Sequence, residues 1–123
     1  GLISLAENHS RKGIIHAAPK DILDALTVFD VANQEAEPHV YITKDKSGAL
    51  CFSTKGKVSK TLLPCEIKGE FKDLILNSII RQTMLNYEKE ESVTIYIGEE
   101  MESVIVTTKE ESKGFCALTK VDV

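Results

Sequence analysis

The chain has 123 residues, of which 42% are hydrophobic and 28% charged, a balance typical of a single globular domain and unlike that of disordered or collagen-like chains. Its formal net charge of −4 at pH 7 excludes a protein that coats nucleic acid through bulk positive charge alone. No apolar stretch approaches the ~20 residues that a membrane-spanning helix needs, so we expect no membrane partner.

Residues 1–11 are polar and irregular, which predicts a leader or linker, and the chain begins with Gly1 rather than methionine. We therefore expect a processed chain or a piece of a longer protein. The three cysteines, Cys51, Cys65 and Cys116, are widely spaced and form no Cys-x-x-Cys pair. This spacing disfavours a zinc site and predicts buried free thiols, as in a cytoplasmic protein.

The first half of the chain predicts one helix among four strands. The apolar run over 13–18 predicts a strand, and Pro19 suits the first turn of the helix that follows. Apolar residues then recur at three- and four-residue spacing, which predicts an amphipathic helix over 19–33. Runs rich in β-branched and aromatic residues, separated by turn residues, predict three more strands, over 40–43, 50–54 and 58–63.

The same order of elements returns after Pro64. We predict a strand over 65–68, a helix over 70–87 and strands over 92–97, 103–108 and 115–121. The chain is thus predicted to be one domain, residues 12–121, made of two β-α-β-β-β half-repeats over 12–64 and 65–121. Such a duplication predicts an α+β fold in which two helices pack on one face of an antiparallel sheet.

Several runs resemble the DNA sliding clamps, in particular one domain of the bacterial DNA polymerase III beta subunit. The run 20–26 resembles the leucine- and alanine-rich opening helix of such a domain, and Leu63-Pro64 resembles the step into its second half. The runs 39–42, 48–54 and 91–97 resemble its strands. The resemblance spans residues 12–121, is looser over the second helix, and lacks a Met-Pro-containing end at 117–121.

This resemblance implies a clamp-like fold and a non-catalytic function. Clamp domains are arranged head to tail into a ring of six that encircles duplex DNA and tethers a polymerase or another replication or repair protein. The resemblance implies no cofactor, metal site or catalytic residue, weak DNA contacts without sequence preference, and a homo-oligomer or a longer multi-domain chain. The DNA-facing positions are then polar residues of the two helices: Lys20, Asp24 and Thr27 on the first, and Lys72, Asn77 and Arg81 on the second.

Two other interpretations remain open at the level of sequence. Few of the polar helix positions are cationic, which favours a stand-alone interaction or regulatory module that binds another protein without encircling DNA. A small cytosolic enzyme that uses Cys51 or Cys65 is a third interpretation, but no nucleophile or phosphate-binding motif supports it. The three histidines have no partner at metal-ligand spacing, and His16, in an apolar run, is predicted to be a core residue.

Overall fold

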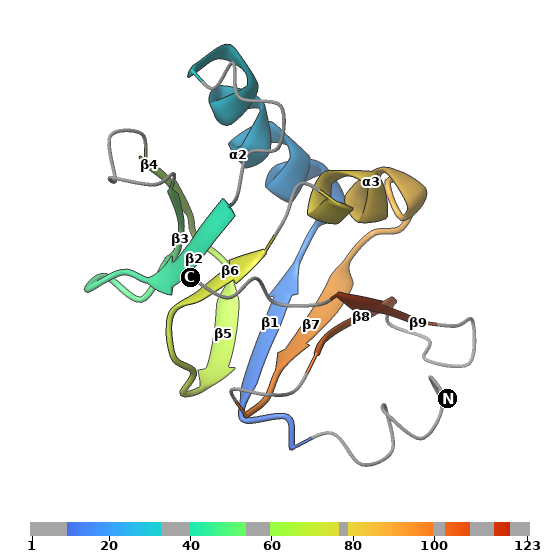
Figure 1. Cartoon of the computed structure of the whole chain (residues 1–123). Coiled ribbons are helices and arrows are strands. Elements are labelled where there is room, and N and C mark those ends of the chain that lie inside the picture. Colours follow the sequence, from blue (N-terminus) through green and yellow to red (C-terminus); the bar gives the residue numbers. More distant parts are fainter. Residues whose placement is uncertain are drawn as a thin grey trace.

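The computed structural model describes residues 10–32, 40–53, 60–76, 79–99, 103–108 and 115–118. Two helices and nine strands lie within these residues. In chain order (Figure 1) they are β1 (Gly13–Ala17), α2 (Pro19–Ala32), β2 (Val40–Lys44), β3 (Leu50–Ser53), β4 (Lys60–Leu63), β5 (Glu66–Gly69), β6 (Leu74–Leu76), α3 (Ile79–Asn86), β7 (Val93–Ile97), β8 (Val104–Thr108) and β9 (Phe115–Leu118).

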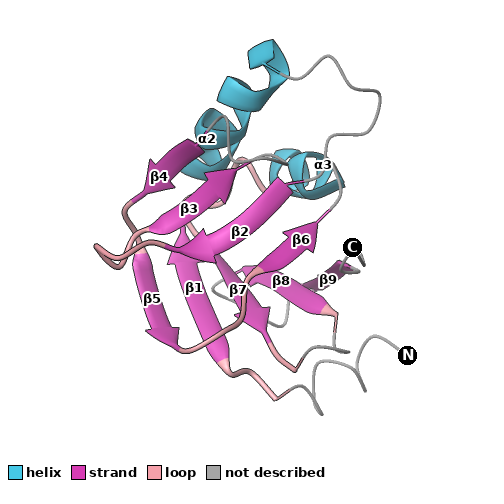
Figure 2. Ribbon diagram, turned by 60° about the vertical axis from the view of Figure 1, so that its left-hand side comes forward, coloured by secondary structure: helices cyan, strands magenta, loops and turns pink. Residues whose placement is uncertain are grey.

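The strands form two antiparallel sheets. One has five strands in the order β5-β1-β7-β8-β9, and the other has four in the order β4-β3-β2-β6. Figure 2 shows one sheet behind the other, with both helices together at the same end of the molecule. The predicted α+β class is confirmed, although the strands belong to two sheets where we expected a continuous one.

The pairing pattern divides the chain into two similar units that exchange their first strands. In the first unit, β1-α2-β2-β3-β4, the strand β1 pairs with β7 of the second unit. In the second unit, β6-α3-β7-β8-β9, the strand β6 pairs with β2 of the first unit. The strand β5 lies outside this symmetry and extends the larger sheet beyond β1. The second unit thus begins at β6, later than the predicted boundary after residue 64.

The core lies between the two sheets and is closed by the helices. Residues at alternate positions of the inner strands point inward, as in the row formed by Ile15, Ile95 and Val106 across β1, β7 and β8. Ile22 of α2 and Met84 of α3 are fully buried in the same cluster. The core leaves a cavity of about 10 Å³, which is lined by apolar side chains of both sheets and of α3.

The helix α2 begins where its sequence predicts. Pro19 occupies its first position, where an N–H group is not needed, and the carbonyl of Ala18 accepts the amide hydrogens of Asp21 and Ile22. Asp21 places a negative charge near the positive end of the helix dipole. Within the described residues, the other predicted elements are likewise confirmed, and their ends shift by one or two positions. The one exception is the predicted second helix.

The predicted helix over 70–87 is wrong in its first half. Residues 70–73 form a connection, Leu74–Leu76 form β6, and the helix α3 covers only Ile79–Asn86. Leu74 and Leu76 point into the core while Ile75 between them does not, which is the two-residue period of a strand. A short apolar run next to a helix satisfies both periods, so the sequence pattern could not separate them.

Two glycines allow β1 and β5 to approach closely. Gly69 has a left-handed backbone (φ 77°), and a Cβ atom there would lie 2.0 Å from the carbonyl oxygen of Lys12. Gly13, its partner across the pair, leaves room for the ring of Phe71. Gly48 is also left-handed (φ 88°), but a Cβ atom there meets nothing within 4 Å.

We predict that Gly69→Ala lowers the free energy of unfolding by clearly more than Gly48→Ala. The left-handed backbone alone costs a non-glycine residue about 1–2 kcal/mol, and both variants carry that cost. Only Gly69→Ala also forces the backbone of Lys12 to move. Urea unfolding of both variants measures the difference, and equal losses would show that the close approach of β1 and β5 contributes nothing.

Candidate nucleic-acid interface

The helices α2 and α3 lie side by side and form one surface of the molecule (Figure 1). This surface contains several of the positions that the sequence predicts to face DNA. The exposed side chains described on it are Lys20, Asp21, Asp24 and Thr27 of α2, and Gln82, Leu85 and Asn86 of α3. It is therefore polar, but its exposed part carries two acids on α2 beside one lysine.

Lys20 and Thr27 lie on the exposed side of α2, as predicted. They are seven residues apart, about two helical turns, and so share one face. The hydroxyl of Thr27 donates a hydrogen bond to the carbonyl of Leu23 at 2.8 Å, within its own helix. Asp24 lies four residues after Lys20 on the same face and reduces the positive potential there.

Arg81 has a role that its predicted position did not suggest. It is half-buried on α3, and its Nη2 atom donates a hydrogen bond to the carbonyl of Leu26 in α2 at 3.2 Å. This contact joins the two helices across residues that are 55 positions apart in the chain. Arg81 thus links the two helices, and part of its hydrogen-bonding capacity is used inside the protein.

The structure separates Lys72 from the other predicted residues. Lys72 lies in the connection between β5 and β6, and not on a helix, so its predicted placement is wrong. Gly69, just before this connection, pairs with Gly13 at the start of β1, whereas the end of β1 leads into α2. Lys72 is thus at the end of the larger sheet that is remote from the helices. Asn77 lies outside the described residues.

Sequence reasoning missed an exposed apolar residue on a sheet edge. Leu62 on β4 is 51% exposed, and β4 is the outer strand of the four-stranded sheet. The signal was present in the sequence, because adjacent residues of a strand point to opposite faces. Of the pair Leu62-Leu63, only Leu63 is buried in the core.

The described residues offer little for metal or nucleophilic chemistry. No group of three or more His, Cys, Asp and Glu residues is found among them in an arrangement that could hold a metal ion. Burial raises the pKa of the Cys65 thiol, which lowers its thiolate fraction at neutral pH, and Cys51 is buried. The His16 ring bonds the hydroxyl of Thr94 on the neighbouring strand at 3.0 Å. His39 lies outside the described residues.

Of the helices that the structure describes, neither has the length and apolar character needed to cross a membrane.

We predict that Arg81→Ala lowers the free energy of unfolding by about 1–2 kcal/mol, the typical worth of a hydrogen bond from a charged donor that is partly shielded from water. Lys20→Ala, which removes an exposed cation from the other helix, serves as the control and is expected to stay within about 0.5 kcal/mol of the parent protein. Denaturant unfolding measures both. An Arg81→Ala variant as stable as Lys20→Ala would mean that the contact with Leu26 does not hold the helices together.

Comparison with known proteins supports the fold. No protein-family model and no curated protein sequence matches the chain. The structure resembles the beta subunit from DNA polymerase of Streptococcus pyogenes, with a TM-score of 0.66 and 15% identity over 93% of this chain and 32% of that one. It also resembles the DNA polymerase III beta subunit of Thermotoga maritima, with a TM-score of 0.65 and 12% identity over 91% of this chain and 31% of that one.

The chain thus spans about a third of the length of both proteins. The resemblance seen in the sequence is confirmed at the level of fold: two exchanged units, two sheets and a pair of adjacent helices form a domain like those of the DNA polymerase III beta subunits.

Proposed function

We propose that this chain is a non-catalytic domain of a sliding clamp, which forms part of a ring around duplex DNA and tethers a polymerase or another replication or repair protein. The observation that carries the proposal is the match of nearly the whole chain to about a third of two DNA polymerase beta subunits. A domain of this size cannot encircle DNA alone, so the proposal requires several domains, supplied by further copies or by a longer chain.

The sheet edges suggest how such domains would join. Each unit ends in an outer strand, β4 in the smaller sheet and β9 in the larger, and Figure 1 shows them on opposite flanks of the molecule. The strand β9 has the uncharged sequence Phe-Cys-Ala-Leu, and β4 exposes one charged residue, Lys60, and one large apolar residue, Leu62. An outer strand has unpaired backbone N–H and C=O groups along one side, and these groups can pair with a strand of another chain. Head-to-tail pairing of β4 with β9 of the next domain would continue both sheets around a ring.

The other two edges are less suited to pairing. The strand β5 exposes Glu66 and Lys68, which form an ion pair at 3.4 Å, and charged side chains on an edge discourage pairing with another strand. The strand β6 has only three residues. The two units are thus equivalent in the edges that we propose to join, because β4 and β9 hold the same position in each.

The helices fit the same arrangement. The helix α2 contacts β4, α3 contacts β9, and the two helices contact each other. Pairing of β4 with a neighbouring β9 therefore brings α2 of one domain near α3 of the next, which forms a continuous helical lining. Lys20 is the one exposed cation described on this surface, which implies weak phosphate contacts without base readout, and weak contacts allow a ring to slide.

A second candidate is an interaction module that binds another protein without encircling DNA. The presence of Asp21 and Asp24 beside Lys20 on the exposed side of α2 favours it, because these acids oppose phosphate binding. Such a module would use the β4 edge to add a strand from its partner. The two candidates differ in whether copies of the chain assemble through their own edges.

We predict that the chain self-associates as its concentration rises and that Leu62→Lys weakens this association at least ~10-fold, since a charge on an edge strand opposes pairing. Thr43→Lys is the matched control, because it adds the same charge to β2, an inner strand of the same sheet. Light scattering over a concentration range gives the mass of each variant. A chain that remains monomeric throughout would contradict assembly of separate copies and favour the interaction module.

A further inference from the structure

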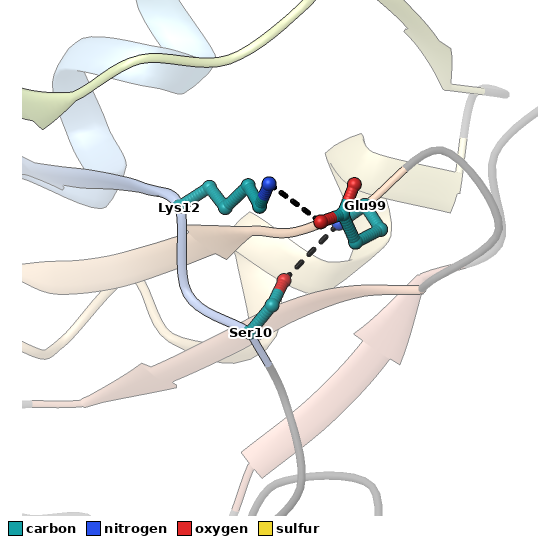
Figure 3. A network of polar contacts seen from close by, with 3 residues as sticks. All are labelled: Ser10, Lys12 and Glu99. Atoms are coloured by element: carbon teal, nitrogen blue, oxygen red, sulfur yellow. Dashed lines mark hydrogen bonds and ion pairs between the residues drawn. The ribbon is translucent and has the colours of Figure 1, made fainter.

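Three consecutive residues before β1 contact Tyr96, near the C-terminal end of β7, and Glu99, two residues after that strand. The Oγ atom of Ser10 accepts a hydrogen bond from the backbone N–H of Glu99 at 3.2 Å, and Nζ of Lys12 lies 2.5 Å from Oε1 of Glu99 (Figure 3). Between them, the guanidinium of Arg11 lies over the ring of Tyr96, 4.4 Å from its centroid. These contacts thus join the segment 10–12 to a segment almost 90 residues later in the chain.

The backbone conformation of Arg11 is strained, and this strain opposes the contacts of the segment. Its φ angle is 48°, and it is the one residue other than glycine with a positive φ in the described part of the chain. A non-glycine residue in this left-handed region is strained and persists there only when its surroundings hold it. In this protein the contacts of Ser10, Arg11 and Lys12 with Glu99 and Tyr96 oppose that strain.

Each contact is weak by itself. The Lys12 and Glu99 side chains are 54% and 58% exposed, so water and salt screen their attraction. The cation–π contact of Arg11 and the single hydrogen bond of Ser10 are also modest. Weak contacts that oppose a strained backbone produce an equilibrium between closed and open forms, and not a permanently fixed segment.

We propose that Ser10–Lys12 is a reversible, salt-sensitive strap, which fixes the direction of the polypeptide that enters β1 and releases it when Glu99 or Tyr96 is disengaged. The strap is at the start of β1, whereas the end of β1 leads into the helix pair. The strap is therefore at the end of β1 away from the helical surface, and the proposal goes beyond the proposed clamp function.

Limited digestion with trypsin tests the strap directly, because trypsin cleaves after arginine and lysine and must bind those side chains in its own pocket. In the closed form, Arg11 and Lys12 are engaged with Tyr96 and Glu99. Cleavage of a transiently opened segment follows the population of the open form. Mass spectrometry gives the rate of cleavage after Arg11 and Lys12, and the rate after Lys89, which is exposed in the turn that follows α3, is the internal reference.

We expect Glu99→Gln to accelerate cleavage after Arg11 and Lys12 several-fold relative to cleavage after Lys89, and Glu99→Gln with Tyr96→Leu to accelerate it on the order of 10-fold. Raising the salt concentration to about 0.5 M should accelerate cleavage of the parent protein more than that of Glu99→Gln, because only the parent has the ion pair to screen.

Glu91→Gln is the matched control, since it removes an exposed carboxylate before β7 and leaves the strap intact. Glu99→Gln and Glu91→Gln should unfold at the same denaturant concentration, which separates opening of the strap from loss of the fold. Equal cleavage after Arg11 and Lys12 in the parent, Glu91→Gln and Glu99→Gln proteins, at low and high salt, would overturn the proposal.

Discussion

The exchange of first strands between the two units is the constraint on which the rest of the structure depends. The strand β1 completes the sheet of the second unit, and β6 completes the sheet of the first. Neither unit can bury its apolar strands without the other, because each sheet contains a strand from both. The helices follow β1 and β6 directly in the chain, so this exchange also brings α2 and α3 together, where Arg81 joins them through the carbonyl of Leu26.

The same exchange determines which parts of the domain are available to partners. Because β1 pairs with β7 and β6 pairs with β2, the last strand of each unit, β4 in the smaller sheet and β9 in the larger, remains at an outer edge. These edges lie on opposite flanks, and each is next to one helix. Two outer strands on opposite flanks, with a helical surface between them, fit the head-to-tail assembly that we propose. The modest charge of the helical surface fits the proposed ring, which would be held on DNA by its closed shape more than by phosphate contacts.

The sequence was sufficient for the features that depend on local periodicity. The spacing of Ile22, Ala25 and Leu26, with Pro19 before them, predicts α2, and the strands on either side follow from β-branched runs and turns. The run 74–80 satisfied a helical period although Leu74 and Leu76 belong to a strand, and Lys72 was consequently assigned to the wrong end of the molecule. Which sheet β6 joins is decided by its pairing with Val40 and Ile42, far along the chain.

In the candidate site, too, the features that follow from local periodicity were predictable and those that depend on distant contacts were not. Lys20 and Thr27 are exposed where the period of α2 predicts them. The contact of Arg81 with Leu26 spans 55 residues and that of Ser10 with Glu99 spans 89, and no local pattern contains such information. The exposure of Leu62 was accessible in principle, because two adjacent leucines in one strand cannot both face the core.

The central claim, that this domain forms part of a closed ring around DNA, is tested most directly by topological retention. The chain is incubated with circular duplex DNA on beads, at a concentration where it is assembled, and the DNA is then cut once. Because a ring assembled from separate copies can close around the circle by mass action, the account predicts that protein stays on the circle and is released on cutting. Equal retention on circular and cut DNA, or no retention on either, would contradict it.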